Sequence, residues 1–252
     1  MSINRRVRLW RTAALSCVVA GLAAAIGATA LSGLHRSEPV ARPTSERTSS
    51  LVPGATVVAR VNGTGIPMRE LQLFLDQDRA AVIAGSPDTA AGAAFWTGLA
   101  GSTTPAQRLV DSTLADAARA AVQFDAARRY GLKAPTDYQD FVAALDAENA
   151  RRAHAVAAGQ PIYGPRQYSE AAYLDYLLGQ TAFDLAQKMA ADGALPTDGA
   201  VAGGDNQLST AYETKIDELV ASATVTTTDA TKVIVNGGCL TTGECEQRGS
   251  SK

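Results

Sequence analysis

The chain has 252 residues, of which 46% are hydrophobic and 19% charged, a balance that is typical of a folded domain and excludes a mainly disordered protein. Ala occupies 49 positions and aromatic residues only 6%, so the composition favours helix over sheet. The net charge of the chain is −2. Residues 1–34 contain four Arg and no acidic residue, so the rest of the chain is mildly acidic. This charge excludes nucleic acid as an expected partner.

The first predicted element is an export segment at residues 12–34, which are uncharged and rich in Ala, Leu, Val and Gly. A basic cluster precedes it: Arg5, Arg6, Arg8 and Arg11. A helix of 23 residues can cross a hydrocarbon core of about 30 Å, with its basic end in the cytoplasm. Two alternatives are a signal peptide cleaved near Ala30 and, less favoured, a lipid anchor at Cys17. All three place the rest of the chain outside the cytoplasm, either membrane-anchored or secreted.

Residues 35–54 contain Pro, Ser, Thr and Arg with few apolar side chains, which predicts a linker. The folded domain is expected over residues 55–228. It opens with a strand at 56–61, whose β-branched run ends in the turn Asn62-Gly63. Four helices follow, each marked by apolar residues at helical spacing and by a capping residue or Pro. Their start signals are Pro67, Thr104, Thr136 and Ser169.

The second half of the predicted domain contains a break, a last helix and a strand. The Gly- and Ala-rich segment 193–206 is the break, and Tyr212, Ile216, Leu219 and Val220 mark the helix after it. A short extended run follows at 223–228. A lone strand leaves its backbone groups unpaired, so residues 224–228 are expected to pair with 56–61. The sequence therefore predicts a mainly α domain, closed by a short two-stranded pairing of its N- and C-terminal ends.

Two cysteines lie in the expected C-terminal tail, residues 229–252. Cys239 and Cys245 enclose a short loop in which Gly243 permits a tight turn. In an oxidising compartment they are expected to form a disulfide worth roughly 2–3 kcal/mol, and the alternative is two free thiols on a frayed tail. Three Cys and two His in the whole chain are too few and too scattered for a zinc site, so no metal is expected.

Five segments of the predicted domain share their order and spacing with a known family. They are Val61-Asn62-Gly63 with Ile66-Pro67-Met68-Arg69-Glu70-Leu71, Ala127-Arg128-Arg129-Tyr130-Gly131-Leu132, Phe141-Val142-Ala143-Ala144-Leu145 with Glu148-Asn149 and Arg151-Arg152, Tyr163-Gly164 with Tyr168 to Tyr176, and Tyr212 to Val225. Together they resemble the chaperone domain of the SurA-like and PrsA-like family of extracytoplasmic foldases. The resemblance covers roughly residues 55–228 and implies a SurA N-terminal-like helical chaperone domain.

The chain departs from that family at one place. In the family a parvulin-type peptidyl-prolyl isomerase domain commonly lies between the last long helix and the returning C-terminal helix. Here that interval is residues 193–206, and 14 residues cannot fold a domain of about a hundred residues. No His follows His154, so the histidines typical of a parvulin site are missing. We therefore expect no catalytic residue, no cofactor and no isomerase chemistry.

Four tyrosines are the candidate peptide-binding residues: Tyr163, Tyr168, Tyr173 and Tyr176. Tyr combines apolar area with a polar tip, which suits extended chains of varied sequence. The alternative for Tyr173 and Tyr176 is that they pack in the core.

With the resemblance, these tyrosines predict an extracytoplasmic chaperone-like module that binds unfolded or newly exported polypeptides and meets the membrane through its N-terminal segment. Two other functions are open: a degenerate peptidyl-prolyl cis-trans isomerase, and a surface docking subunit for one dedicated partner.

Overall fold

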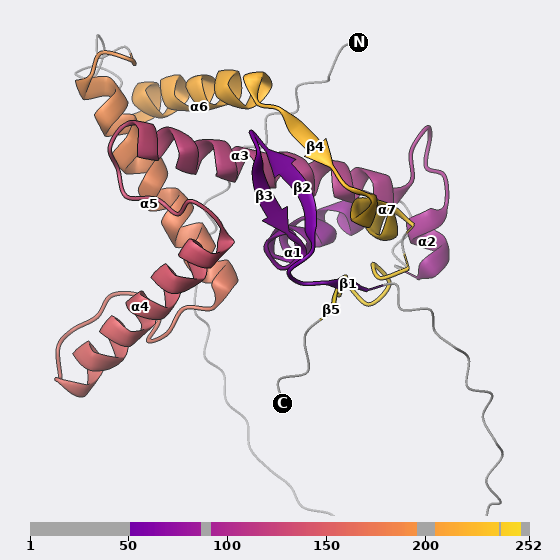
Figure 1. Cartoon of the computed structure of the whole chain (residues 1–252), viewed down its shortest axis with the longest axis horizontal. Coiled ribbons are helices and arrows are strands. Elements are labelled where there is room, and N and C mark those ends of the chain that lie inside the picture. Colours follow the sequence, from indigo (N-terminus) through magenta and orange to yellow (C-terminus); the bar gives the residue numbers. More distant parts are fainter. Residues whose placement is uncertain (1–50, 87–91, 196–204, 237, 248–252) are drawn as a thin grey trace, which may run out of the picture. The chain divides into compact units, whose positions relative to one another are not determined.

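A computed structural model describes residues 51–86, 92–195, 205–236 and 238–247, and over these residues the protein is mainly helical (Figure 1). All of them belong to one unit, residues 46–252. The predicted export segment 12–34 lies outside the described residues. Among the helices that are described, none has the length and apolar character needed to span a bilayer.

The two ends of the predicted domain meet in a small sheet. Strand β2 (Val57–Val61) pairs antiparallel with β4 (Val225–Thr227), and Val61 lies opposite Val225. The predicted pairing of the ends is therefore confirmed.

The sheet has a third strand, β3 (Thr64–Pro67), which pairs with the other side of β2. The hairpin between them turns at Asn62 and Gly63, whose φ angles of 49° and 89° are those that Asn-Gly turns favour. The sequence did not predict β3, because Pro67 resembles a helix start. In the structure Pro67 ends the strand and also precedes the first turn of the next helix.

The described residues form seven helices. They are α1 (Met68–Ala84), α2 (Ala93–Thr97), α3 (Pro105–Arg129), α4 (Tyr138–Ala157), α5 (Glu170–Ala191), α6 (Asp205–Ser222) and α7 (Asp229–Val235). Helix α3 is the central one, since it contacts α1, α2, α5, α6, α7 and β2. Helix α4 instead packs against α5.

Local capping explains where the helices begin. The Thr104 hydroxyl accepts a hydrogen bond from the Gln107 N–H, and Ser169 caps α5 in the same way through Ala172. The predicted cap of α4 is one residue out of register. Asp137, not Thr136, accepts from the first free N–H groups of that helix, because its carboxylate reaches two of them at once.

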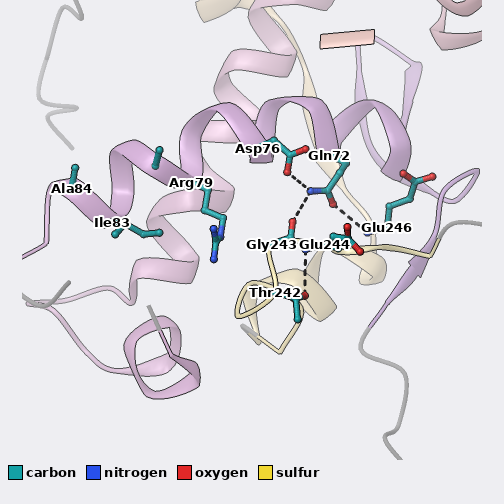
Figure 2. A pocket seen from close by; sticks show the side chains of 10 residues that line it. Gln72, Asp76, Arg79, Ile83, Ala84, Thr242, Gly243, Glu244 and Glu246 are labelled. Atoms are coloured by element: carbon teal, nitrogen blue, oxygen red, sulfur yellow. Dashed lines mark hydrogen bonds between the residues drawn. The ribbon is translucent and has the colours of Figure 1, made fainter. Parts of the chain in front are cut away.

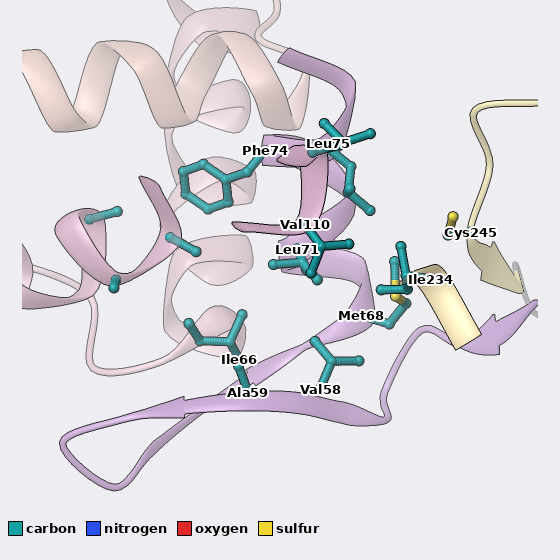
Figure 3. Close-up of a cluster of buried hydrophobic side chains, with 14 of the residues drawn as sticks. Val58, Ala59, Ile66, Met68, Leu71, Phe74, Leu75, Val110, Ile234 and Cys245 are labelled. Atoms are coloured by element: carbon teal, nitrogen blue, oxygen red, sulfur yellow. The ribbon is translucent and has the colours of Figure 1, made fainter. Parts of the chain in front are cut away.

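Two groups of buried side chains hold these elements together. The larger one lies between the sheet, α1, α3 and α7, and Figure 3 shows side chains such as Val58, Met68 and Ile234 converging on it. The smaller one joins α3, α5 and α6 through Leu185, Ile216 and their neighbours. Of the stripe that marks the last long helix, Tyr212 and Ile216 are fully buried, and Leu219 and Val220 are partly buried.

The folded part of the chain extends beyond residue 228, where the sequence analysis ended the domain. Ile234, Cys239, Leu240 and Cys245 belong to the larger core, and Cys239 and Cys245 form a disulfide in the structure. Strand β5 (Glu246–Gln247) pairs in parallel with β1 (Val52–Pro53), so part of the expected linker is also folded.

The buried side chain of Gln72 fixes the C-terminal loop on α1. Its amide nitrogen donates to the Gly243 carbonyl at 2.8 Å, and its amide oxygen accepts from the N–H groups of Cys245 at 2.9 Å and Glu246 at 3.2 Å. Glu246 then forms an ion pair with Arg69 at 2.9 Å. These contacts join residues that are far apart in the chain, so no local pattern in the sequence predicts them.

Replacing Gln72 by Leu should destabilise the protein, because three backbone groups of the C-terminal loop lose their partner. Each buried polar group left unpaired costs about 1–3 kcal/mol, so the melting temperature should fall by several degrees. Gln77→Leu is the matched control, since Gln77 lies on the same helix, is exposed, and donates to the side chain of Asp175. Circular dichroism melts of both variants test this; equal melting temperatures for Q72L and Q77L would contradict it.

Candidate functional site

The structure brings three of the four predicted tyrosines together. The rings of Tyr168 and Tyr176 stack at 5.4 Å, and Tyr173 lies 5.7 Å from the first and 6.1 Å from the second. Tyr173 is 6% exposed and Tyr176 is 44% exposed, so the core alternative holds for Tyr173 and not for Tyr176. Tyr163 is 91% exposed and lies in the loop between α4 and α5.

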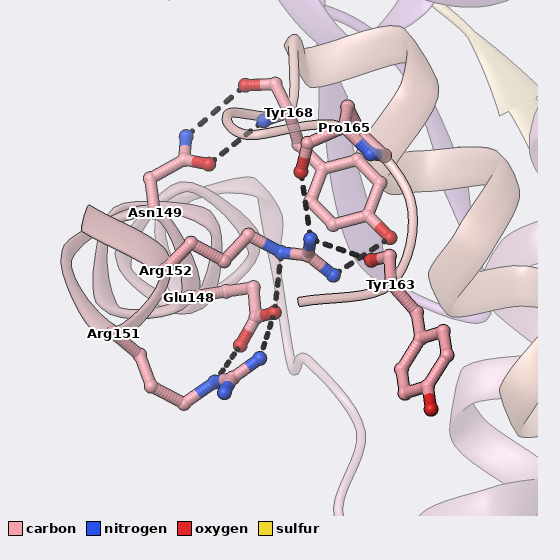
Figure 4. A network of polar contacts seen from close by, with 7 residues as sticks. All are labelled: Glu148, Asn149, Arg151, Arg152, Tyr163, Pro165 and Tyr168. Carbon is pink, nitrogen blue, oxygen red and sulfur yellow. Dashed lines mark hydrogen bonds and ion pairs between the residues drawn. The ribbon is translucent and has the colours of Figure 1, made fainter. Parts of the chain in front are cut away.

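A buried arginine holds this loop in place, as Figure 4 shows. The guanidinium of Arg152 lies 4.3 Å from the centre of the Tyr168 ring and donates to the Tyr168 hydroxyl at 3.2 Å. It also donates to the carbonyls of Tyr163 at 2.9 Å and Pro165 at 2.7 Å, and pairs with Glu148 at 2.7 Å. Five donors in a fixed plane suit a guanidinium to this role.

Asn149 completes the attachment of the loop to α4. Its side-chain amide pairs with both backbone groups of Tyr168, donating to the carbonyl at 3.0 Å and accepting from the N–H at 2.8 Å. The sequence analysis quoted Glu148-Asn149 and Arg151-Arg152 only as part of a resemblance. The spacing of Glu148 from Arg151 and Arg152 permits their ion pairs. The attachment of the loop could not be read from spacing, because there the partners are backbone groups more than ten residues away.

The aromatic contacts continue inward along α4 and α5. Tyr173 lies 5.7 Å from Phe141, and Phe141 stacks on Tyr138 at 5.8 Å. The hydroxyl of Tyr138 donates to Glu170 at 2.5 Å, and burial together with this carboxylate raises the pKa of Tyr138. We call this set the aromatic row: Tyr138, Phe141, Tyr173, Tyr168 and Tyr176.

The inner end of the aromatic row lines a small cavity of about 110 Å³, which we call the Glu70 cavity. Its walls come from the β2–β3 hairpin, α1, α3, α4 and α5. Apolar side chains make up much of the lining, and Tyr138 and Phe141 belong to both the row and the cavity. Tyr138 and Phe141 thus border the cavity on one side and, on the other, the buried Tyr173, which packs against the exposed Tyr176.

Glu70 places a partly buried carboxylate in this cavity, and no neighbouring cation pairs with it. Within the described residues its carboxylate has no hydrogen bond or ion pair. Burial, and to a smaller extent the charge of Asp137, raise the pKa of Glu70 to about 7. In the sequence Glu70 was part of a segment that carries the family resemblance, and its environment was not predicted, because partial burial of a carboxylate depends on elements far away in the chain.

A second, larger cavity of about 510 Å³ lies between α1 and the disulfide loop (Figure 2). Its polar side chains already serve the fold. Gln72 holds the loop backbone, Arg79 donates to the Leu240 carbonyl at 3.3 Å, and Glu246 pairs with Arg69. The Glu70 cavity is the better candidate for a ligand, since its carboxylate is not used in this way.

The described residues offer little for metal or acid–base chemistry. Nowhere in this part of the chain do three or more His, Cys, Asp or Glu side chains gather as metal ligands. His154 is exposed near the end of α4. The arrangement can offer aromatic surface and the partly buried carboxylate of Glu70, which are means of binding.

Arg152→Met should destabilise the protein by about 2–4 kcal/mol, because the loop carbonyls lose their donors and Tyr168 loses its cation. Arg151→Met is the matched control, since Arg151 is an exposed neighbour that pairs with the same glutamate, Glu148. We expect R151M to melt within about a degree of the wild type, as exposed ion pairs contribute little. Urea unfolding followed by circular dichroism decides it, and comparable losses in both variants would be inconsistent with a structural role specific to Arg152.

The contribution of Glu70 to stability should fall as pH rises from about 4.5 to 7. In this range the folded protein keeps a proton on Glu70 that the unfolded chain has lost, so ionisation above pH 7 costs on the order of 3 kcal/mol. Glu70→Gln should remove that part of the pH dependence and be more stable than the wild type at pH 8. Urea unfolding at pH 5 and pH 8 gives the measurement, with Glu218→Gln as the control at an exposed site on α6. An unchanged pH dependence in E70Q would show that Glu70 is not the group responsible.

Comparison of the chain with protein-family models, with curated proteins and with solved structures finds no match. The function is therefore argued from the residues of this site and from the resemblance noted in the sequence.

Proposed function

We propose that the protein is an extracytoplasmic chaperone-like module that binds unfolded or newly exported polypeptides and has no isomerase chemistry of its own. The observation that carries the proposal is the aromatic surface of α5. Tyr176 is exposed at the outer end of the aromatic row, and Phe183, 61% exposed, lies seven residues further along the same helix. Seven residues are about two helical turns, so both rings lie on one face.

The surroundings of the two rings suit a varied, extended ligand. Gly179 lies between them and is open, since a Cβ at this position would meet nothing within 4 Å. Ala172 is exposed one turn before Tyr176. Small residues between aromatic ones leave shallow recesses for side chains of different sizes. Neighbouring exposed apolar groups on a soluble protein can mark a surface that binds a partner.

The compartment in this proposal is supported by two independent features of the chain. Residues 12–34 have the composition of an export segment. The Cys239–Cys245 disulfide in the core also fits an oxidising compartment outside the cytoplasm.

The full-length protein should suppress the aggregation of a chemically unfolded model protein, as measured by light scattering. The double variant Tyr176→Ser with Phe183→Ser should weaken client binding about tenfold, because anchor aromatics carry most of the energy of such contacts. Leu99→Ser with Val225→Thr is the control, since these exposed apolar side chains lie away from α5, in the segment after α2 and on β4. If the wild type gives no suppression at several-fold molar excess, the proposal fails.

The two alternative functions give different results in further assays. A degenerate isomerase would accelerate proline-limited refolding, which takes tens of seconds or longer without catalysis, and we expect no acceleration. A docking subunit would retain one stoichiometric partner in pull-downs from membranes, whereas a chaperone retains a varied set.

A further inference from the structure

The size of the Glu70 cavity indicates what kind of group it can hold. Pockets for small-molecule ligands and cofactors usually measure about 300–1,000 Å³. The Glu70 cavity, at about 110 Å³, is well below that range. An engineered cavity of about 150 Å³ holds a benzene molecule, so this one matches a single side chain. A cofactor of ordinary size is therefore too large for this cavity, whereas a single side chain of a polypeptide is of a suitable size.

The lining of the cavity specifies the chemistry of that residue. Apolar walls are formed by Ile66, Leu73, Phe124, Phe141 and Leu174. They favour a long aliphatic stem. The unpartnered carboxylate of Glu70 favours a positive charge at the end of the stem. Lys and Arg are the residues that combine these two features.

The other charged groups around the cavity are already engaged. On α3, Asp125 pairs with Arg128 at 3.3 Å and with Arg129 at 2.6 Å. At the start of α4, Asp137 accepts two backbone hydrogen bonds as the helix cap. Among the described residues that line the cavity, the charge still without a partner is thus the negative charge of Glu70.

We propose that the Glu70 cavity binds the side chain of a Lys or Arg residue of the bound polypeptide, with Glu70 as its ion-pair partner. The inference rests on the proposed function and adds to it a preference for polypeptide segments that contain Lys or Arg. Helix α5 carries the exposed Tyr176 and also contributes Leu174 to the cavity wall, so the preferred segments carry a basic residue together with apolar ones. On binding, the partly buried carboxylate of Glu70 gains the ion-pair partner that it lacks in the free protein.

Two labelled peptides test the proposal. One is unstructured and has a central Lys between apolar residues, and the other has norleucine in place of the Lys, which keeps the stem and removes the charge. At pH 8 we expect the full-length protein to bind the Lys peptide about tenfold more tightly in fluorescence anisotropy. Glu70→Gln should abolish this preference, whereas Glu218→Gln, which removes the same charge from α6, should keep it. The preference should also decline towards pH 5, as Glu70 becomes protonated.

Each outcome separates this inference from the proposed function. If wild type binds both peptides equally well, Glu70 is not a counter-charge and the inference is overturned, while polypeptide binding stands. If neither peptide binds, the proposed function itself is contradicted. A preference that survives in E70Q also overturns the inference. A measurement on the wild type is independent of the folding of E70Q: in carboxyl NMR titrations the Lys peptide must lower the pKa of Glu70, and an unchanged pKa would refute the ion pair.

Discussion

The pairing of β2 with β4 is the constraint on which the rest of the fold depends, because it joins the two ends of a long helical chain. It is reinforced by side chains that follow β4. The hydroxyl of Thr231, on α7, donates to the carbonyl of Val58 at 2.7 Å, although the two residues are 173 positions apart. Closure at this point orders α7 beside the sheet and thereby completes the larger core. The cost in loop-closure entropy is modest, since it grows only with the logarithm of loop length.

The C-terminal loop shows how a short segment becomes part of such a core. The disulfide makes residues 239–245 a compact unit, and Gln72 supplies the hydrogen bonds that the loop backbone cannot make within itself. Polar and apolar contacts act together here: Leu240 is buried while the backbone beside it is paired. A buried loop without such a partner would leave its peptide groups unsatisfied.

The binding site depends on a different arrangement, in which α4 is attached to α5 by aromatic and charged contacts. Arg152 and Asn149 fix the loop that carries Tyr163 and Tyr168, so the rings at the surface rest on a rigid support. A rigid aromatic surface loses little conformational entropy when it binds a flexible chain. Arg152 and Asn149 have hydrogen-bond partners in the protein, whereas the carboxylate of Glu70 has none among the described residues. A buried charge without a partner lowers stability, and such departures from local consistency are where function is expected.

The sequence by itself determined the five long helices, the caps of α3 and α5, and the pairing of the chain ends. These features depend on residues within one or two turns of each other, or on the general need of a strand for a partner, and both can be read from a linear pattern. The third strand, the inclusion of residues 229–247, the burial of Tyr173 beside an exposed Tyr176, and the environment of Glu70 were decided by the tertiary structure. Each of these depends on which distant surface covers a residue. A residue's own neighbours in the sequence do not carry that information.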